Sequence, residues 1–174
     1  MQGTTHVSCG LCTAAAFAVF PPATSAVPLL ASAIPTTFIA QVLLVATAAL
    51  GSLIPDIDHP VSTISNHARL SGKLIRCFVE RRGALHAPLL WIALALLCAT
   101  FFPKIHIVIA GFLIGIVAHL ALDSLNSVGI PLLWPLTKKK FHLLRIKTGS
   151  GLDRLIGSLF LIGFVGVLIA GVLQ

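Results

Sequence analysis

The chain has 174 residues, of which 57% are apolar and only 10% are charged, and its mean hydropathy is +1.02. Soluble domains average about 45–50% apolar and about 25% charged residues, so this composition excludes both a water-soluble globule and a disordered chain. The formal net charge of +7 would suggest nucleic-acid binding in a soluble protein. Here the basic residues gather in two short segments between apolar runs, which indicates membrane topology, and we expect no nucleic-acid partner.

Five apolar segments are candidates for crossing a bilayer, which takes about 20 helical residues. The first segment is short and ends at two consecutive prolines, so it is also compatible with a half-span lying in the interface. The sequence therefore predicts an all-α integral membrane protein, a bundle of about five transmembrane helices forming a single polytopic domain over residues 1–174. The predicted spans are residues 6–20, 36–54, 85–102, 105–126 and 155–173.

The lysines and arginines predict the orientation of this bundle. Five of the twelve fall between the second and third spans and six between the fourth and fifth, whereas Lys104 alone falls between the third and fourth. Because Lys and Arg favour cytoplasmic loops, we expect both basic segments and the N-terminus in the cytoplasm and the C-terminus outside. Basic loops on this side would also attract anionic lipid headgroups.

Other stretches are predicted not to span. Residues 60–82 alternate apolar and basic positions at helical spacing, which is typical of an amphipathic helix lying on a membrane surface. Residues 129–135 are apolar but contain two prolines, so we expect a loop with Trp134 at the level of the headgroups. On the fourth span, Gly111 and Gly115 permit close helix contact, either within the chain or with a partner.

Acidic residues are rare, and two of the five stand together at the predicted cytoplasmic end of the second span. Asp56 and Asp58 lie with His59 in the segment P-D-I-D-H-P. Carboxylates and an imidazole this close are suitable ligands for divalent metals, although Asp-rich turns beside proline are also ordinary loop chemistry. Asp153, at the start of the fifth span, is expected to complement a helix N-terminus.

The fourth span carries an ionisable pair. His119 and Asp123 are four residues apart and share one helix face. An acid at the bilayer centre costs about 2.5–3.5 kcal/mol, so the pair is expected either to bind a ligand or to form a hydrogen bond that holds helices together. His86 begins the third span and His6 the first, both on the predicted side of Asp123. The sequence thus predicts that ionisable side chains of four segments converge at one membrane face.

These motifs resemble the YdjM-like family of bacterial inner-membrane proteins, described as metal-dependent hydrolases. The resemblance extends from about residue 5 to residue 160. The chain departs from the family pattern at four positions. Arg81 stands where the family has His, and Leu85, Ala87 and Asn126 stand where the family has residues with hydroxyl groups. The matching motifs are Thr5-His6, P-D-I-D-H at residues 55–59, R-R-G-A-L-H-A at residues 81–87, and the stretch from His119 through Asp123 to G-I-P-L-L-W-P at residues 129–135.

Together the residues and the resemblance predict a divalent metal centre at the cytoplasmic face of a bacterial inner membrane. Zinc is the expected ion, and Mn, Fe or Mg also suit carboxylate and imidazole ligands. His59 or Asp58 is predicted to act as general base or hydrogen-bond partner. The predicted ligands are Asp56, Asp58, His86, His119 and Asp123, with His6 as a further candidate.

The predicted function is hydrolysis of a phospholipid or a polyprenyl phosphate, with anionic headgroups of the cytoplasmic leaflet as partners. Two alternatives stay open at this point. One is a non-catalytic membrane protein with a structural metal site. The other is a proton-coupled transporter, which would need polar groups continuing toward the outer face. In the outer halves of the predicted spans, the polar residues are few, chiefly His106 and Gln41. The sequence does not indicate the oligomeric state.

Overall fold

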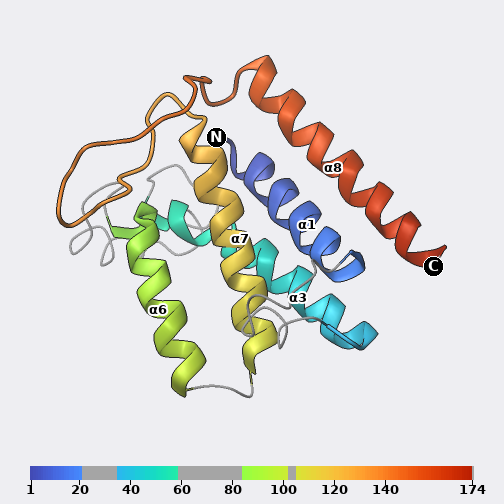
Figure 1. Cartoon of the computed structure of the whole chain (residues 1–174). Helices are drawn as coiled ribbons and strands as arrows, with labels where there is room; N and C mark the ends of the chain where they lie inside the picture. The colour runs from blue at the N-terminus through green and yellow to red at the C-terminus, as the bar shows by residue number, and fades with distance from the viewer. Residues whose placement is uncertain (21–34, 59–83, 102–104, 174) are drawn as a thin grey trace.

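The computed structural model describes residues 1–20, 35–58, 84–101 and 105–173. In this part of the chain the regular elements are helices, and the backbone pairing outside them amounts to two isolated bridges, which confirms the predicted all-α class. The long helices are α1 (Gly3–Val19), α3 (Phe38–Gly51), α6 (Pro88–Phe101), α7 (His106–Ser124) and α8 (Gly151–Val172), and the two 3-10 helices are η2 (Ile54–Asp58) and η3 (Ala84–His86) (Figure 1).

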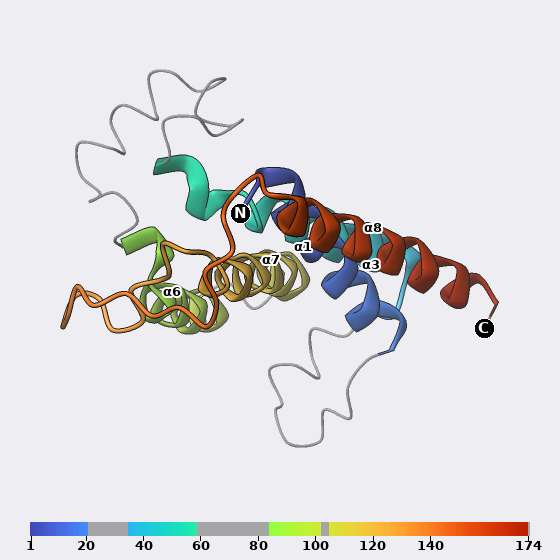
Figure 2. The same cartoon turned by 90° about the horizontal axis from the view of Figure 1, so that it is seen from above.

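The helix α7 lies at the centre of the bundle. It packs against α3, α1 and α6, and α8 covers the side of α1 that faces away from α6 (Figures 1 and 2). The start of α1, the end of α7, η2 and η3 gather at one end of the bundle (Figure 1). This packing brings together segments that are far apart in the sequence.

Three helical segments are long and apolar enough to cross a membrane, counting the described residues: Phe38–Asp56, α7 and α8. They correspond to the second, fourth and fifth predicted spans. The first and third predicted spans are also helical, but α1 has 17 residues and α6 has 14. At 1.5 Å per residue these helices are about 26 and about 21 Å long, shorter than the hydrocarbon core of about 30 Å.

Two helices begin at other residues than predicted, one because of a proline and one because of a serine cap. The third span was expected from residue 85, but α6 begins at Pro88, because proline suits the first turn of a helix and Ala84–His86 forms η3 instead. The fifth was expected from residue 155, but α8 begins at Gly151, because the Ser150 hydroxyl accepts a hydrogen bond from Asp153 N at 3.3 Å. The predicted amphipathic helix at residues 60–82 lies outside the described residues.

Glycines allow α3 and α7 to approach closely. A Cβ added at Gly115 would lie 2.0 Å from the Ala48 carbonyl oxygen, and one added at Gly111 would lie 2.1 Å from Thr47 Oγ1. Because any side chain here would push the backbones apart, this small-residue face serves contact within the chain. The close approach places the end of α3 directly against α7.

The chain after α7 folds back as an irregular loop, as predicted for residues 129–135. Ile130 and Phe141 exchange two backbone hydrogen bonds of 2.9 and 2.8 Å. Closer to α7, Ile146 N donates to Leu125 O at 3.0 Å. These bonds connect the second half of the loop to the residues that follow α7, and the loop then leads into α8.

Candidate metal centre

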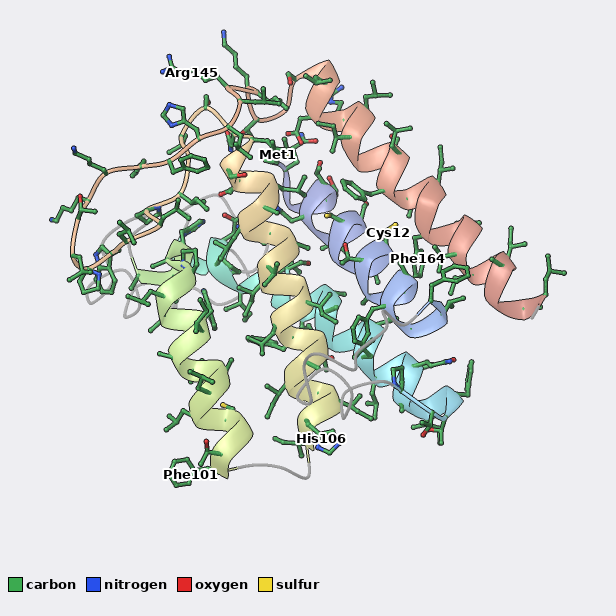
Figure 3. The ribbon with its side chains drawn as sticks, viewed as in Figure 1. Met1, Cys12, Phe101, His106, Arg145 and Phe164 are labelled. Carbon is green, nitrogen blue, oxygen red and sulfur yellow. The ribbon has the colours of Figure 1, made fainter. Side chains whose placement is uncertain are left out.

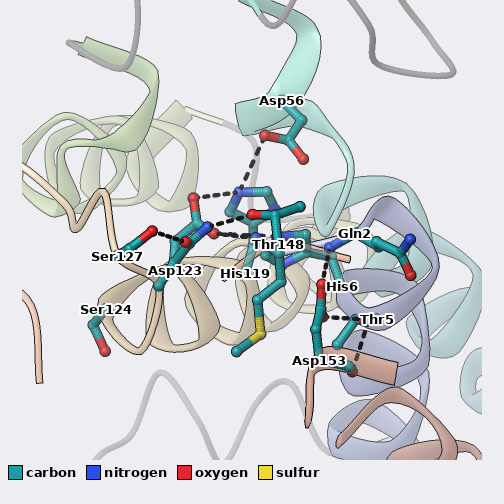
Figure 4. A network of polar contacts seen from close by, with 12 residues as sticks. Gln2, Thr5, His6, Asp56, His119, Asp123, Ser124, Ser127, Thr148 and Asp153 are labelled. Carbon is teal, nitrogen blue, oxygen red and sulfur yellow. Dashed lines mark hydrogen bonds and ion pairs between the residues drawn. The ribbon is translucent and has the colours of Figure 1, made fainter. Parts of the chain in front are cut away.

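Ionisable side chains from three separate elements meet where the ends of α3 and α7 come together. Asp56 is on η2, His86 on η3, and both His119 and Asp123 are on α7; one ligand atom from each lies within 4.8 Å of all the others. Figure 4 shows Asp56 above the helix end that carries His119 and Asp123. His106 lies at the opposite end of α7 (Figure 3).

The separations within this group suit ligands of one ion. His86 Nε2 lies 3.5 Å from Asp123 Oδ2 and 3.8 Å from Asp56 Oδ1. His119 Nε2 lies 3.8 and 3.9 Å from the same two oxygens. Ligand atoms placed about 2.0–2.1 Å from a tetrahedral zinc ion are about 3.3–3.4 Å from one another, so small side-chain movements would complete such a site. Two carboxylates and two imidazoles also suit Mn, Fe or Mg.

The group is buried. The side chains of His86, His119 and Asp123 have no exposed surface, whereas that of Asp56 is 14% exposed. Buried ionisable groups are costly without a compensating charge or hydrogen bonds, above all inside a membrane. Asp56 is therefore the member of the group that lies on its exposed side.

One contact orients the His119 ring. Its Nδ1 lies 2.6 Å from the Ser52 carbonyl oxygen, and since a carbonyl only accepts, Nδ1 carries the hydrogen and donates it. In the neutral ring the lone pair is then on Nε2, which is buried and has no hydrogen-bond partner among the described residues. A lone pair that faces two carboxylate oxygens is stabilised by a cation between them, so these side chains fit a divalent metal. Hydrogen bonds of this kind commonly orient metal-ligating histidines.

His6 approaches the group from the other side. Its ring stacks on that of His119, with centroids 3.8 Å apart and planes 16° apart. His6 Nε2 lies 3.4 Å from Asp123 Oδ1, and the Met1 amino nitrogen lies 2.9 Å from the same oxygen. Asp123 therefore faces partners with both of its carboxylate oxygens.

The structure brings together the predicted ligands Asp56, His86, His119 and Asp123, with His6 beside them. The Asp58 side chain and all of His59 lie outside the part that the structure describes, and the predicted general base therefore has no observed position.

Two supporting contacts could not be predicted from the sequence. Ser52 acts through its backbone carbonyl, which any residue would supply, so no side-chain pattern could have indicated it. Asp153 lies in the first turn of α8 as expected, but its carboxylate also accepts hydrogen bonds from Thr5 Oγ1 at 2.9 Å and Gln2 N at 3.1 Å. These bonds fix the first turn of α1 against α8, and His6 follows Thr5 directly.

The apolar helices and the buried carboxylate–imidazole group define an integral membrane helical bundle with a candidate metal centre. The family described as YdjM inner membrane protein matches residues 1–173, and the chain belongs to this family. The resemblance found in the sequence motifs is thereby confirmed.

Relatives include the uncharacterized protein YvsG of Bacillus subtilis (strain 168), which is 33% identical over 159 residues, covering 90% of this chain and 87% of that protein. The inner membrane protein YdjM of Escherichia coli (strain K12) is 32% identical over 121 residues, covering 65% of this chain and 60% of that protein. The same figures hold for the inner membrane protein YdjM of Shigella flexneri. No solved structure matches the chain.

Proposed function

We propose that this chain is a membrane-embedded, metal-dependent hydrolase in which Asp56, His86, His119 and Asp123 hold a divalent ion, with zinc as the first choice. The proposal depends on one observation: one ligand atom from each of these residues lies within 4.8 Å of all the others. A divalent ion held there would supply Lewis acidity toward a phosphoryl oxygen and would activate a water for attack.

The residues of the chain have distinct roles in this proposal. The Ser52 carbonyl holds the His119 ring so that Nε2 faces the carboxylates. Burial of Asp123 and the two histidines keeps bulk water from the inner side of the centre. Asp56, the partly exposed member, faces the approaching substrate. Asp58 and His59 follow Asp56 in the chain, and one of them would accept the proton of the attacking water.

We propose a lipid phosphate as the substrate, either a phospholipid or a polyprenyl phosphate. The loop that follows α7 carries exposed cationic side chains at positions 138–140, at Arg145 and at Lys147. Cations next to a membrane-embedded site attract anionic headgroups of the adjacent leaflet, which the basic loops predict to be the cytoplasmic one.

Metal content tests the centre itself. Protein purified in detergent and dialysed against zinc should hold zinc, and His119→Ala should lose the ion bound by the four residues. The matched control is His106→Ala, the same substitution at the far end of the same helix, and it should keep the wild-type content. Equal zinc in wild type and His119→Ala would contradict the proposed centre.

Turnover is tested on reconstituted protein. Vesicles containing an anionic phospholipid or a polyprenyl phosphate should release phosphate or a phosphorylated headgroup, chelation should stop the release, and added zinc should restore it. Release that continues after complete metal removal would contradict a metal-dependent reaction.

A structural metal site is the second candidate, and burial favours it. Three of the four ligand side chains have no exposed surface, as expected of a closed structural site. Leu85 and Ala87 beside His86 also lack the hydroxyls of the family pattern. Zinc that raises the unfolding temperature but supports no release from either lipid would favour this candidate.

A further inference from the structure

We propose that the group binds two divalent ions, with Asp123 as the carboxylate that bridges them and His6 as a ligand of the second ion. This inference rests on the proposed metal centre and extends it. The first ion is the one held by Asp56, His86, His119 and Asp123.

The stacking of His6 on His119 argues against one shared ion. An imidazole nitrogen binds a metal in the plane of its ring, and these two planes are 16° apart with centroids separated by 3.8 Å. Lone pairs in nearly parallel planes point to separate positions about as far apart as the rings. That separation matches the spacing of about 3.5–4 Å between the ions of two-metal sites.

The two carboxylate oxygens of Asp123 lie near different imidazole nitrogens, as two separate ions would require. Oδ2 lies 3.5 Å from His86 Nε2 and 3.8 Å from His119 Nε2, whereas Oδ1 lies 3.4 Å from His6 Nε2. The Met1 amino nitrogen also faces Oδ1, at 2.9 Å, so this oxygen is on a side that accommodates positive charge. A carboxylate with one oxygen toward each set of nitrogen atoms has the arrangement of a bridging ligand.

The position of His6 is built into the fold. Its side chain has no exposed surface, and neither ring nitrogen has a hydrogen-bond partner within the described ranges. The turn that carries it is fixed by the hydrogen bonds from Thr5 and Gln2 to the buried Asp153. A buried imidazole held in place without a hydrogen bond is costly, and an ion between Nε2 and Asp123 would compensate that cost.

Metal stoichiometry tests the inference on the full chain in detergent, with zinc as the probe. Wild type loaded with zinc and freed of excess should hold two ions per chain, and His6→Ala should hold one. His6→Phe keeps a ring stacked on His119 but has no ligand atom, so it should also hold one. His106→Ala should keep two.

Loading with Mn²⁺ gives a second readout, which is independent of zinc stoichiometry. Two Mn²⁺ ions bridged by a carboxylate couple magnetically, so wild type saturated with Mn²⁺ should give the electron paramagnetic resonance spectrum of a coupled pair. In His6→Phe the spectrum should change to that of isolated Mn²⁺.

The results separate this inference from the proposed function. One zinc in wild type, kept in His6→Ala and lost in His119→Ala, would overturn the second ion and leave the first centre standing, with His6 as an ion-pair partner of Asp123. An uncoupled Mn²⁺ spectrum in saturated wild type would overturn it in the same way. Wild type that binds neither metal would overturn both proposals.

Discussion

Gly115→Ala should weaken metal binding although residue 115 is not a ligand. Gly115 lies one turn before His119 on α7, and Ala48 lies one turn before Ser52 at the end of α3. The contact between Gly115 and Ala48 therefore sets the distance between the helices at the next turn, where Ser52 holds His119.

The structure gives the size of the effect. The added Cβ would lie 2.0 Å from Ala48 O and 2.7 Å from Ser52 N, whereas real Cβ contacts essentially never fall below 3.0 Å. The backbones must therefore separate by about 1 Å, which stretches the 2.6 Å contact between Ser52 O and His119 Nδ1 to about 3.6 Å, beyond a hydrogen bond. Overpacking of this kind costs about 1–3 kcal/mol of stability. Losing the contact that orients a ligand weakens metal affinity by about 10- to 100-fold.

The assay is zinc affinity in detergent, measured by competition with a chelator, alongside helix content and unfolding temperature by circular dichroism. Gly166→Ala is the control, because a Cβ at this position on α8 meets no atom within 4 Å. A folded Gly115→Ala protein with the zinc affinity of wild type would refute the idea that the spacing of α3 and α7 orients His119.

Three further substitutions test other contacts. Asp153→Asn replaces a buried acceptor of several hydrogen bonds, so stability should fall by about 1.5–3 kcal/mol, and an unchanged unfolding temperature would contradict this. Trp91→Phe removes the 2.8 Å bond from the indole to Leu85 O, and with it a constraint next to His86, so zinc affinity should fall several-fold in the chelator assay. Replacing the lysines at 138–140 by glutamine should reduce binding to anionic vesicles at low salt and leave zinc content unchanged; equal binding would argue against headgroup attraction.

The meeting of distant side chains could be predicted because a membrane restricts how helices run. Helices that cross a bilayer alternate in direction, so charge bias and the number of crossings decide which ends share a face. The spacing of His119 and Asp123 then fixes the face of α7 that carries the site. This reasoning placed Asp56, His86 and His6 at the same end as Asp123, and the structure brings them together there.

Features that depend on tertiary packing could not be predicted. The two glycines of α7 allowed contact with any helix, and only the packing shows that α3 is the partner. The helix starts at Pro88 and Gly151 depend on a first-turn proline and on the Ser150 cap, which hydropathy does not record. Nor does helical spacing indicate that His6 stacks on His119 and lies closest to the other oxygen of Asp123.

The distances distinguish the two roles that the sequence left open for the intramembrane His–Asp pair. A pair that only holds helices together would place a ring nitrogen within about 2.7–3.2 Å of one carboxylate oxygen. Instead, His119 Nε2 lies 3.8 Å from Asp123 Oδ2 and 3.9 Å from Asp56 Oδ1. Such nearly equal distances to two acids, slightly longer than a hydrogen bond, are expected when the side chains face a common metal position. Because the carboxylate oxygens of Asp56 and Asp123 also attract a cation, the arrangement favours metal binding over a purely structural hydrogen bond.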